Sequence, residues 1–540
     1  MRPDRVLKTR DTVAPGPARR PGDAGRAYTG SQASLPGAHP VDWASAPGRF
    51  KVYSGVPRIA FGGRGRTAGG PRSGVLGDLL HGAYGVTRMR WTAPGALKWV
   101  GADGSAWTAL RPVPSGGARF PAELYVLAGP DFGVPTGVYH YDPVHHGLVT
   151  LRAGDWRPVL ARCLGHPRGP VPALTLLVGV VFGKSTAKYG DLGYRLCALD
   201  AGALIGQILT LAEGSGLQAT VRYQFLDQGL EDLLGTGAAH EGVYGVITID
   251  ANEARATDPA ASLGEPASPR GPDPLEVPAP LGENLPLDPA SVAGQLHRAS
   301  RICDPASLIP PGSMRQITTQ AIASLDSLAL APSTLDLMVG LHTRRSSMGY
   351  FTPHKLTFRQ FSALAATAGA GYANDIDPGP HALTSVQLFC AVNRVEDMPP
   401  GVYRYAPHRH TAELVRAADL HDELQAAALP AAPFNLAHVS LSIYAVGHYE
   451  RGYSVYGDRW YRMQNMEAGI VLQRLHLASA ALGLACRANL GYDVHRTDRL
   501  LGLDQTGTTS LVQVLIGTAR EPGDFYEQTC SPPRQRGVGP

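Results

Sequence analysis

The sequence predicts two tandem α+β domains that share one fold. Residues 188–195 read KYGDLGYR and residues 455–462 read VYGDRWYR. Three glycine pairs also recur at nearly one interval: Gly137 with Gly401, Gly190 with Gly457, and Gly235 with Gly502. Such steady spacing over a long interval indicates duplication of a whole domain, because solenoid repeats are far shorter. The length of 540 residues also exceeds what a single hydrophobic core usually holds.

The first copy contains segments with the apolar period of an α-helix and segments with the apolar pattern of a β-strand. An apolar helical pattern covers residues 74–86, and a denser one at residues 200–217 predicts an interior helix. Strands are predicted where apolar residues alternate with polar ones or form a continuous run, as in buried strands. These segments are residues 123–128, 137–143, 171–182 and 243–249.

The second copy repeats that order. Helices are predicted at residues 357–368 and 467–484, and strands at residues 386–392, 401–407, 438–446 and 511–516. Composition sets the boundaries: a disordered arm at 1–40, domain 1 at 41–250, a Pro/Ala/Gly-rich linker at 251–290, domain 2 at 291–518, and a flexible tail at 519–540.

Composition also narrows the class of protein. A net charge of +4 leaves no electrostatic footprint for nucleic acid. The 6 cysteines form no C-x-x-C pair, so we expect neither a metal site nor a redox dithiol. No signal peptide and no uncharged apolar run of about 20 residues is evident, which predicts a cytoplasmic protein without a membrane segment.

A first candidate binding stretch is Pro114-Ser115-Gly116-Gly117. Small residues let the backbone approach a flat or phosphorylated ligand, and the serine adds a hydroxyl group. By itself the stretch also reads as an ordinary turn. The matching region of the second copy, residues 371–385, has no such cluster.

A second candidate is Arg344-Arg345-Ser346, where adjacent guanidiniums and a hydroxyl suit a phosphate group. The alternative interpretation is a solvated charged turn.

The third candidate is Lys188-Tyr189, whose side chains both have ordinary pKa values near 10. Burial lowers the pKa of a lysine and a nearby cation lowers that of a tyrosine, so either residue is a candidate proton acceptor. Val455 replaces the lysine in the second copy.

Six stretches together resemble the nitroreductase-like flavoenzymes, and among them the SagB-type peptide azoline dehydrogenases. They read RPVPSGGARFPAELYVLA, GVYHYDPVHHGL, KYGDLGYR, TRRSSMGYF, GVYRYAPHRHTAELVRAADL and VYGDRWYRMQNMEAGIVLQRLHLASAALGL. The resemblance implies two FMN-dependent nitroreductase-like domains that form an intramolecular pseudo-dimer. It also implies that a loop late in domain 2, Arg487-Ala488-Asn489-Leu490-Gly491, joins Arg344, Arg345 and Ser346 in binding FMN, together with Pro114, Ser115, Gly116 and Gly117.

The same resemblance gives one FMN per chain, because the reciprocal site lacks the Arg-Ser stretch, the glycine turn and the lysine. Met348 stands where the family often has a basic residue, and Arg487 is a candidate replacement. The implied activity is oxidation of thiazoline or oxazoline rings on a ribosomally made precursor peptide. A cyclodehydratase is the expected partner and dioxygen the expected electron acceptor.

Two other functions stay open from the sequence. One is an NAD(P)H-dependent reductase of nitro compounds, quinones or dehydroamino acids, although no G-x-G-x-x-G follows a strand. The other is a non-catalytic scaffold of a peptide-modifying complex. The presence of flavin and its response to NADPH distinguish all three functions.

Overall fold

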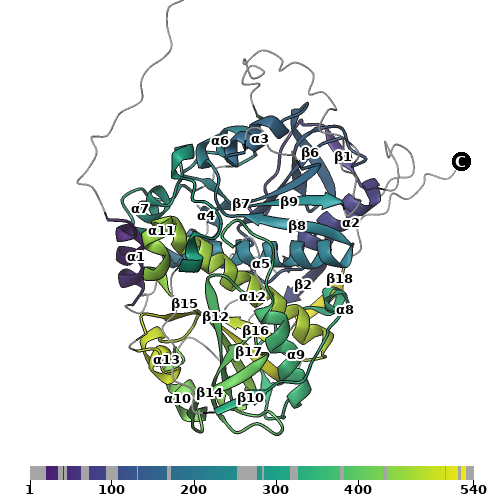
Figure 1. Ribbon diagram of the computed structural model, residues 1–540. Coiled ribbons are helices and arrows are strands. Elements are labelled where there is room, and N and C mark those ends of the chain that lie inside the picture. The colour runs from purple at the N-terminus through teal and green to yellow at the C-terminus, as the bar shows by residue number, and fades with distance from the viewer. Residues whose placement is uncertain are drawn as a thin grey trace, which may run out of the picture.

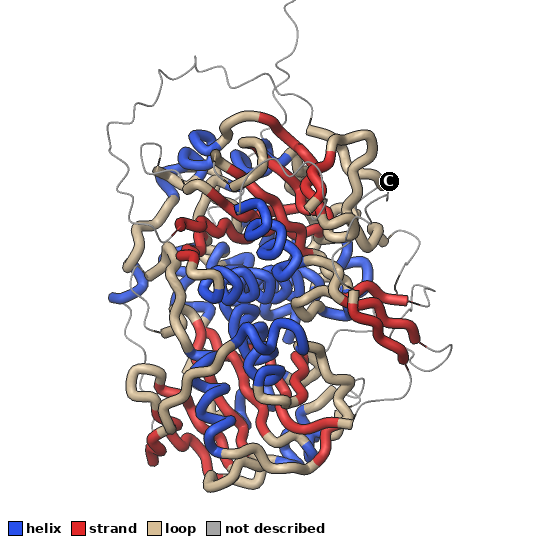
Figure 2. Tube along the Cα trace, turned by 90° about the vertical axis from the view of Figure 1, so that its right-hand side faces the viewer, coloured by secondary structure: helices blue, strands red, loops and turns tan. Residues whose placement is uncertain are grey.

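A seven-stranded and an eight-stranded antiparallel sheet enclose a layer of long helices (Figure 1). The computed structural model describes residues 20–33, 41, 46–61, 72–92, 107–130, 132–166, 172–251, 277–282, 285–316, 326–377, 382–429, 434–504, 506–520 and 525–530. Figure 2 shows the strands of each half above and below the central helices. The predicted α+β class and the pseudo-dimeric arrangement are therefore confirmed.

The strand order of the first sheet is repeated in the second. The first runs β1 (Arg58–Ala60), β6 (Gly147–Ala153), β5 (Gly137–Asp142), β4 (Ala122–Ala128), β7 (Leu174–Val181), β9 (Glu241–Ala251), β8 (Leu217–Arg222). The second runs β10 (Asp326–Ala329), β14 (Thr411–Ala417), β13 (Gly401–Ala406), β12 (Val386–Val392), β15 (Leu441–Gly447), β17 (Thr509–Ala519), and β17 pairs with both β16 (Ala485–Asn489) and β11 (Phe351–Thr352).

Shorter helices cover the outer face of each sheet (Figure 1). Helices α3 (Arg157–Cys163) and α6 (Asp227–Leu234) pack on the first sheet, and α10 (His421–Ala427) and α13 (Val494–Leu500) pack on the second. Nearer the middle lie α2 (Arg72–Tyr84), α4 (Gly183–Tyr189), α7 (Val292–Ala299), α8 (Leu337–Thr343), α9 (Phe358–Gly369) and α11 (Tyr449–Tyr456).

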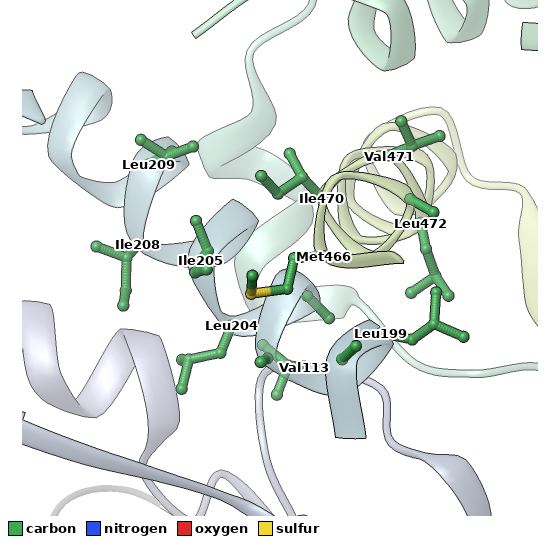
Figure 3. Close-up of a cluster of buried hydrophobic side chains, with 14 of the residues drawn as sticks. Val113, Leu199, Leu204, Ile205, Ile208, Leu209, Met466, Ile470, Val471 and Leu472 are labelled. Carbon is green, nitrogen blue, oxygen red and sulfur yellow. The ribbon is translucent and has the colours of Figure 1, made fainter. Parts of the chain in front are cut away.

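The two longest helices cross at the centre and join the halves. Helices α5 (Leu192–Gly214) and α12 (Arg459–Ala481) each have 23 residues and are almost wholly buried. Figure 3 shows apolar side chains of both helices, including Leu199, Ile205, Met466 and Ile470, gathered at this crossing. By length and composition α5 is apolar enough to span a membrane, but it lies in the interior against α12.

Glycine permits the close approach of these helices. A Cβ atom on Gly202 would lie 1.9 Å from the backbone oxygen of Met466, and one on Gly469 would lie 2.2 Å from that of Leu199. The two contacts are related by the interval that separates the repeats. The central crossing is thus a pseudo-symmetric interface built on backbone contact.

We expect Gly202→Ala and Gly469→Ala each to lower the free energy of unfolding by about 1–3 kcal/mol, the usual cost of overpacking a core. The backbone atoms in the way cannot rotate aside as a side chain can. Urea denaturation followed by circular dichroism measures the change. Gly30→Ala in α1 (Asp23–Ala33) is the control, because a Cβ there meets nothing within 4 Å; equal stability of all three variants would contradict the expectation.

The structure corrects the predictions for both ends of the chain. Within the predicted disordered arm, residues 20–33 contain helix α1, whose Tyr28 is fully buried and donates to the backbone oxygen of Asp191 over 2.6 Å. Within the predicted flexible tail, β18 (Phe525–Thr529) pairs with β2 (Arg88–Thr92) of the first half. Short polar segments carry too few apolar residues to show their periodicity, and long-range contacts order them here.

Most of the predicted linker lies outside the described residues, which include only 277–282 and 285–290 of it. The described part contacts the first half: Pro280 forms a β-bridge with Tyr53, and Leu287 is buried.

Candidate active site between the halves

The glycine turn and the Lys-Tyr pair meet in the first half. Gly117 has a left-handed backbone, with φ of 58°. A Cβ at this position would lie 2.3 Å from Tyr189 Oη and 2.9 Å from Lys188 Nζ. A side chain at residue 117 would therefore collide with the predicted catalytic pair, so the turn needs glycine on grounds of both space and conformation.

Lys188 and Tyr189 lie at the C-terminal end of α4, where the chain breaks before α5. Gly190 makes the break with φ of 54°, and Gly457 repeats it in the second half with φ of 56°. Both side chains are half-buried, and Lys188 Nζ lies 5.1 Å from the centre of the Tyr189 ring. The break presents the pair at the end of a short helix, next to the turn.

Arg344 of the second half lies against the segment that leads into this turn. The residue follows α8 and is buried, and its Nη2 donates to the backbone oxygen of Arg111 over 3.1 Å. Its Nε and Nη1 are buried and have no hydrogen-bond partner among the described residues. Buried guanidinium nitrogens without a protein partner suit a ligand that accepts hydrogen bonds.

Arg487 joins the segment predicted as a late loop to the Arg-Ser stretch. The structure corrects that prediction, because residues 487–489 belong to strand β16 and only Leu490 and Gly491 of the segment follow the strand. Its Nη1 donates to Ser347 O over 2.6 Å, and Ser347 N donates to Cys486 O over 2.8 Å. The Nε of Arg487 is likewise buried without a hydrogen-bond partner in the described part of the chain. The charge of Arg487 also acts on the Tyr189 hydroxyl. Guanidiniums of the second half and the Lys-Tyr pair of the first therefore belong to one cluster.

This cluster is strongly cationic. Burial, and then the charge of Arg88, lower the pKa of Arg344 to about 9. Burial, and then the charge of Arg90, lower the pKa of Arg487 to about 10. Mutual repulsion of this kind is relieved by an anion, so the cluster suits a phosphate or carboxylate ligand.

Sequence reasoning missed two of these cations, Arg88 and Arg90 on β2. Arg88 Nη2 donates to Arg344 O over 2.9 Å, and Arg90 Nη1 lies 3.7 Å from Met348 Sδ. Glu527 of β18 binds both guanidiniums. The alternation of arginine with apolar residues from Arg88 to Trp91 was an available signal for a strand with one charged face.

The pKa of the Tyr189 hydroxyl differs from the one expected from the sequence. Burial and the Asp200 carboxyl raise its pKa to about 12, against the opposing charges of Arg119 and Arg487. The prediction that a nearby cation brings this tyrosine toward neutrality is therefore wrong. A raised pKa makes Tyr189 a poor candidate for the base, and Lys188 stays a candidate.

The remaining predicted site residues lie near the cluster with varied contacts. Arg345 is exposed, and Pro114, Ser346, Ala488 and Leu490 are partly buried. Asn489 turns toward the sheet, because its Nδ2 donates to Gln513 Oε1 over 2.7 Å. Gly491 accepts a hydrogen bond from Leu429 N over 2.9 Å. Within residues 487–491, Arg487 is the residue whose side chain reaches the cluster.

On the side related by the pseudo-symmetry, the segment that matches the glycine turn contacts β8 of the first half. Val221 on β8 donates to Ala373 O over 2.9 Å and accepts from Asp375 N over 3.2 Å. The Asp375 carboxylate accepts from Tyr223 N and Gln224 N. Tyr456 is the counterpart of Tyr189. Burial and then the Asp375 carboxyl raise the pKa of Tyr456, whereas the Arg487 charge opposes the raised pKa of Tyr189. On this side the segment that matches the glycine turn is therefore held by backbone contacts to β8.

Among the described residues, no group of three or more His, Cys, Asp or Glu side chains is arranged to hold a metal ion.

Comparison with known proteins places this geometry in a family. No protein-family model matches the chain. The Methanocaldococcus jannaschii protein MJ1384, which carries a nitroreductase name, is 32% identical over 146 residues, covering 26% of this chain and 72% of the relative. A crystal structure of a nitroreductase-named protein from Anabaena variabilis has a TM-score of 0.71 at 22% identity and covers 93% of this chain and all of that one.

Two further relatives carry the names of processing proteins. The microcin B17-processing protein McbC of Escherichia coli is 27% identical over 123 residues, which are 22% of this chain and 45% of McbC. The trifolitoxin-processing protein TfxB of Rhizobium leguminosarum is 26% identical over 151 residues, 26% of this chain and 39% of TfxB. The chain thus spans less than half the length of either of these two relatives. From the shared fold and the similarity to MJ1384, the chain belongs to the nitroreductase family.

Proposed function

We propose that the chain is an FMN-dependent dehydrogenase that oxidises thiazoline or oxazoline rings on a ribosomally made peptide to thiazoles or oxazoles. Similarity to the two processing proteins, McbC and TfxB, supports the substrate class. One observation carries the proposal: a buried guanidinium cluster from the second half adjoins a lysine-tyrosine pair and a glycine turn from the first.

The residues of the cluster fit FMN. Arg344 and Arg487 have unused buried donors, which suit the phosphate or another anionic part of the cofactor. Arg345, Ser346 and residues 488–491 flank them as further contacts. The turn at residues 114–117 carries no large side chain and would accept the flat ring. When bound, FMN would supply the acceptor for a hydride.

Lys188 supplies the base in this proposal. Conversion of an azoline to an azole removes two electrons and two protons from the ring. Once deprotonated, the amine of Lys188 accepts the acidic proton from the former Cα, and a hydride leaves from the adjacent ring carbon. Tyr189, protonated at neutral pH, donates a hydrogen bond that orients the ring or the amine. Dioxygen takes the electrons afterwards.

The stoichiometry in this proposal is one FMN per chain, because Val455 replaces the lysine on the reciprocal side, where Ala373 and Asp375 are hydrogen-bonded to Val221 of β8. The proposal also includes a cyclodehydratase partner that makes the azoline, and a cytoplasmic location.

The decisive experiment combines a spectrum with two reductants. The purified chain is titrated with FMN, and one equivalent is expected to bind and give a flavin absorption band. An azoline-containing peptide added without oxygen is then expected to bleach the band, and air to restore it. Bleaching by NADPH and not by the peptide would favour a reductase, which the similarity to MJ1384 supports. A chain that takes up no FMN would favour the scaffold.

We expect Arg344→Met to weaken FMN binding by about 10–100-fold, since a hydrogen bond to a charged group contributes about 1.5–3 kcal/mol. Fluorescence quenching of FMN measures the dissociation constant. Arg359→Met on α9 is the control, because that arginine is exposed. Equal affinity of the two variants would remove Arg344 from the cofactor site.

A further inference from the structure

We propose that Asp200 is a positioning residue for the cofactor: from the interior helix α5 its carboxyl holds the turn at residues 114–117 against Lys188 and Tyr189. The inference rests on the proposed function and adds a residue that no sequence motif singled out.

The contacts of Asp200 are aimed at this turn. Ser115 Oγ donates to Asp200 Oδ2 over 2.5 Å, and Gly116 N donates to Oδ1 over 3.2 Å. Ser115 Oγ in turn accepts from Phe120 N over 2.8 Å. The serine hydroxyl therefore links both ends of the loop to one buried carboxyl.

The loop needs such a restraint because its backbone is strained. Gly117, Ala118 and Phe120 all have positive φ values, of 58°, 54° and 48°. Only the first of these is glycine, and a left-handed conformation costs other residues free energy that surrounding contacts must offset. The carboxyl and the serine hydroxyl supply contacts at both sides of the strained residues.

The ionisable groups on which the Asp200 charge acts include Tyr84 of α2, Tyr189 of α4 and Cys197 of α5. Burial raises the pKa of Asp200 to about 7, although the Ser115 and Gly116 contacts lower it. Burying a carboxyl costs free energy unless hydrogen bonds compensate it, and the hydroxyl of Ser115 and the amide of Gly116 supply two such bonds.

The second half contains a counterpart of Asp200. Glu467 lies 267 residues later, at the same turn of α12 as Asp200 on α5. Its carboxylate accepts hydrogen bonds from Thr384 N, Ser385 N, Ser385 Oγ, Val386 N and Tyr372 Oη. Four of these five donors lie at the start of β12, and the fifth, Tyr372 Oη, comes from the segment that follows α9. The repeat thus keeps an acid at this place in both halves, but in the first half it restrains the proposed cofactor turn.

The test compares the two acids in the full chain by two readouts. One is the dissociation constant for FMN. The other is hydrogen exchange of residues 114–121 in the flavin-free protein. Asp200→Ala is expected to raise the dissociation constant by about 10-fold or more and to speed exchange in this segment, because two hydrogen bonds are lost. Asp200→Asn keeps an acceptor for Gly116 N and is expected to recover most of the affinity.

Glu467→Gln is the matched control, expected to lower the melting temperature while leaving the FMN affinity within about 2-fold and exchange at residues 114–121 unchanged. If Asp200→Ala fails to fold, Ser115→Ala makes the same test without changing α5, and is expected to loosen the same segment. Wild-type affinity together with wild-type exchange in either variant would overturn the inference. A wild-type chain that binds no FMN would overturn the proposed function instead, and the exchange readout would still decide whether Asp200 restrains the turn.

Discussion

Replacing Lys188 by alanine is expected to lower the rate of azoline oxidation by about 10²–10⁴-fold, the usual contribution of a general base. FMN should stay bound, because the guanidiniums of Arg344 and Arg487 are untouched. Single-turnover bleaching of the flavin by an azoline-containing peptide measures the rate of the chemical step. The ratio of flavin to protein, measured on the same sample, shows whether the cofactor is retained.

Two further lysine variants separate a base from a mere charge. Lys188→Arg keeps the positive charge but cannot accept a proton near neutrality, so it should be as slow as the alanine variant. Lys355→Ala removes an exposed lysine of the second half and should leave the rate unchanged. Full activity in Lys188→Arg would show that Lys188 acts through its charge, and the base would have to be sought elsewhere.

Replacing Asp227 by asparagine is expected to destabilise the chain by about 3–5 kcal/mol, the typical cost of leaving buried charges unpaired. Asp227 belongs to α6 of the first half, and its carboxylate binds Arg459 over 2.6 Å and Arg462 over 2.8 Å on α12. All three side chains are buried. The substitution therefore removes the carboxylate that binds Arg459 and Arg462 between the two halves. Urea denaturation measures the resulting loss in the free energy of unfolding.

The acid dependence of stability gives a second readout for Asp227. Burial opposes its ionisation, but Arg459 and Arg462 outweigh burial and hold the pKa at about 2. A lowered carboxyl pKa stabilises the fold above the unfolded value of 3.8, and this contribution is lost as the pH falls toward 2. Asp227→Asn should lack that part of the acid transition. Glu450→Gln, which breaks an exposed pair with Arg26, should cost only about 0–1 kcal/mol; a similar loss in both variants would contradict the argument.

Much of the fold could be predicted from the sequence because its core elements carry strong periodicity. The strand at residues 386–392 lies where it was expected, and the interior helix expected at residues 200–217 is α5, at Leu192–Gly214. The candidate residues at 114–117, 188–189, 344 and 487 also come together. The repeat was visible because Gly190 and Gly457 must both adopt a left-handed backbone, which few residues other than glycine do.

The rest depends on contacts that no local pattern encodes. Strand β18 exists because it pairs with β2, more than 400 residues earlier in the chain. Asp200 resembles any polar residue in an apolar helix until Ser115 is seen beside it. The pKa of Tyr189 is set by how deeply it is buried, whereas the sequence shows only which charges could be near.

The Gly202–Gly469 crossing has a consequence for how this protein can evolve. In an enzyme that pairs two identical subunits, one codon change alters both sides of the interface, and the pair separates when diluted. Here each glycine is encoded separately, and the partners remain together at any concentration because one polypeptide holds them. One side can therefore change without the other, as at Val455, which stands where the first half has Lys188.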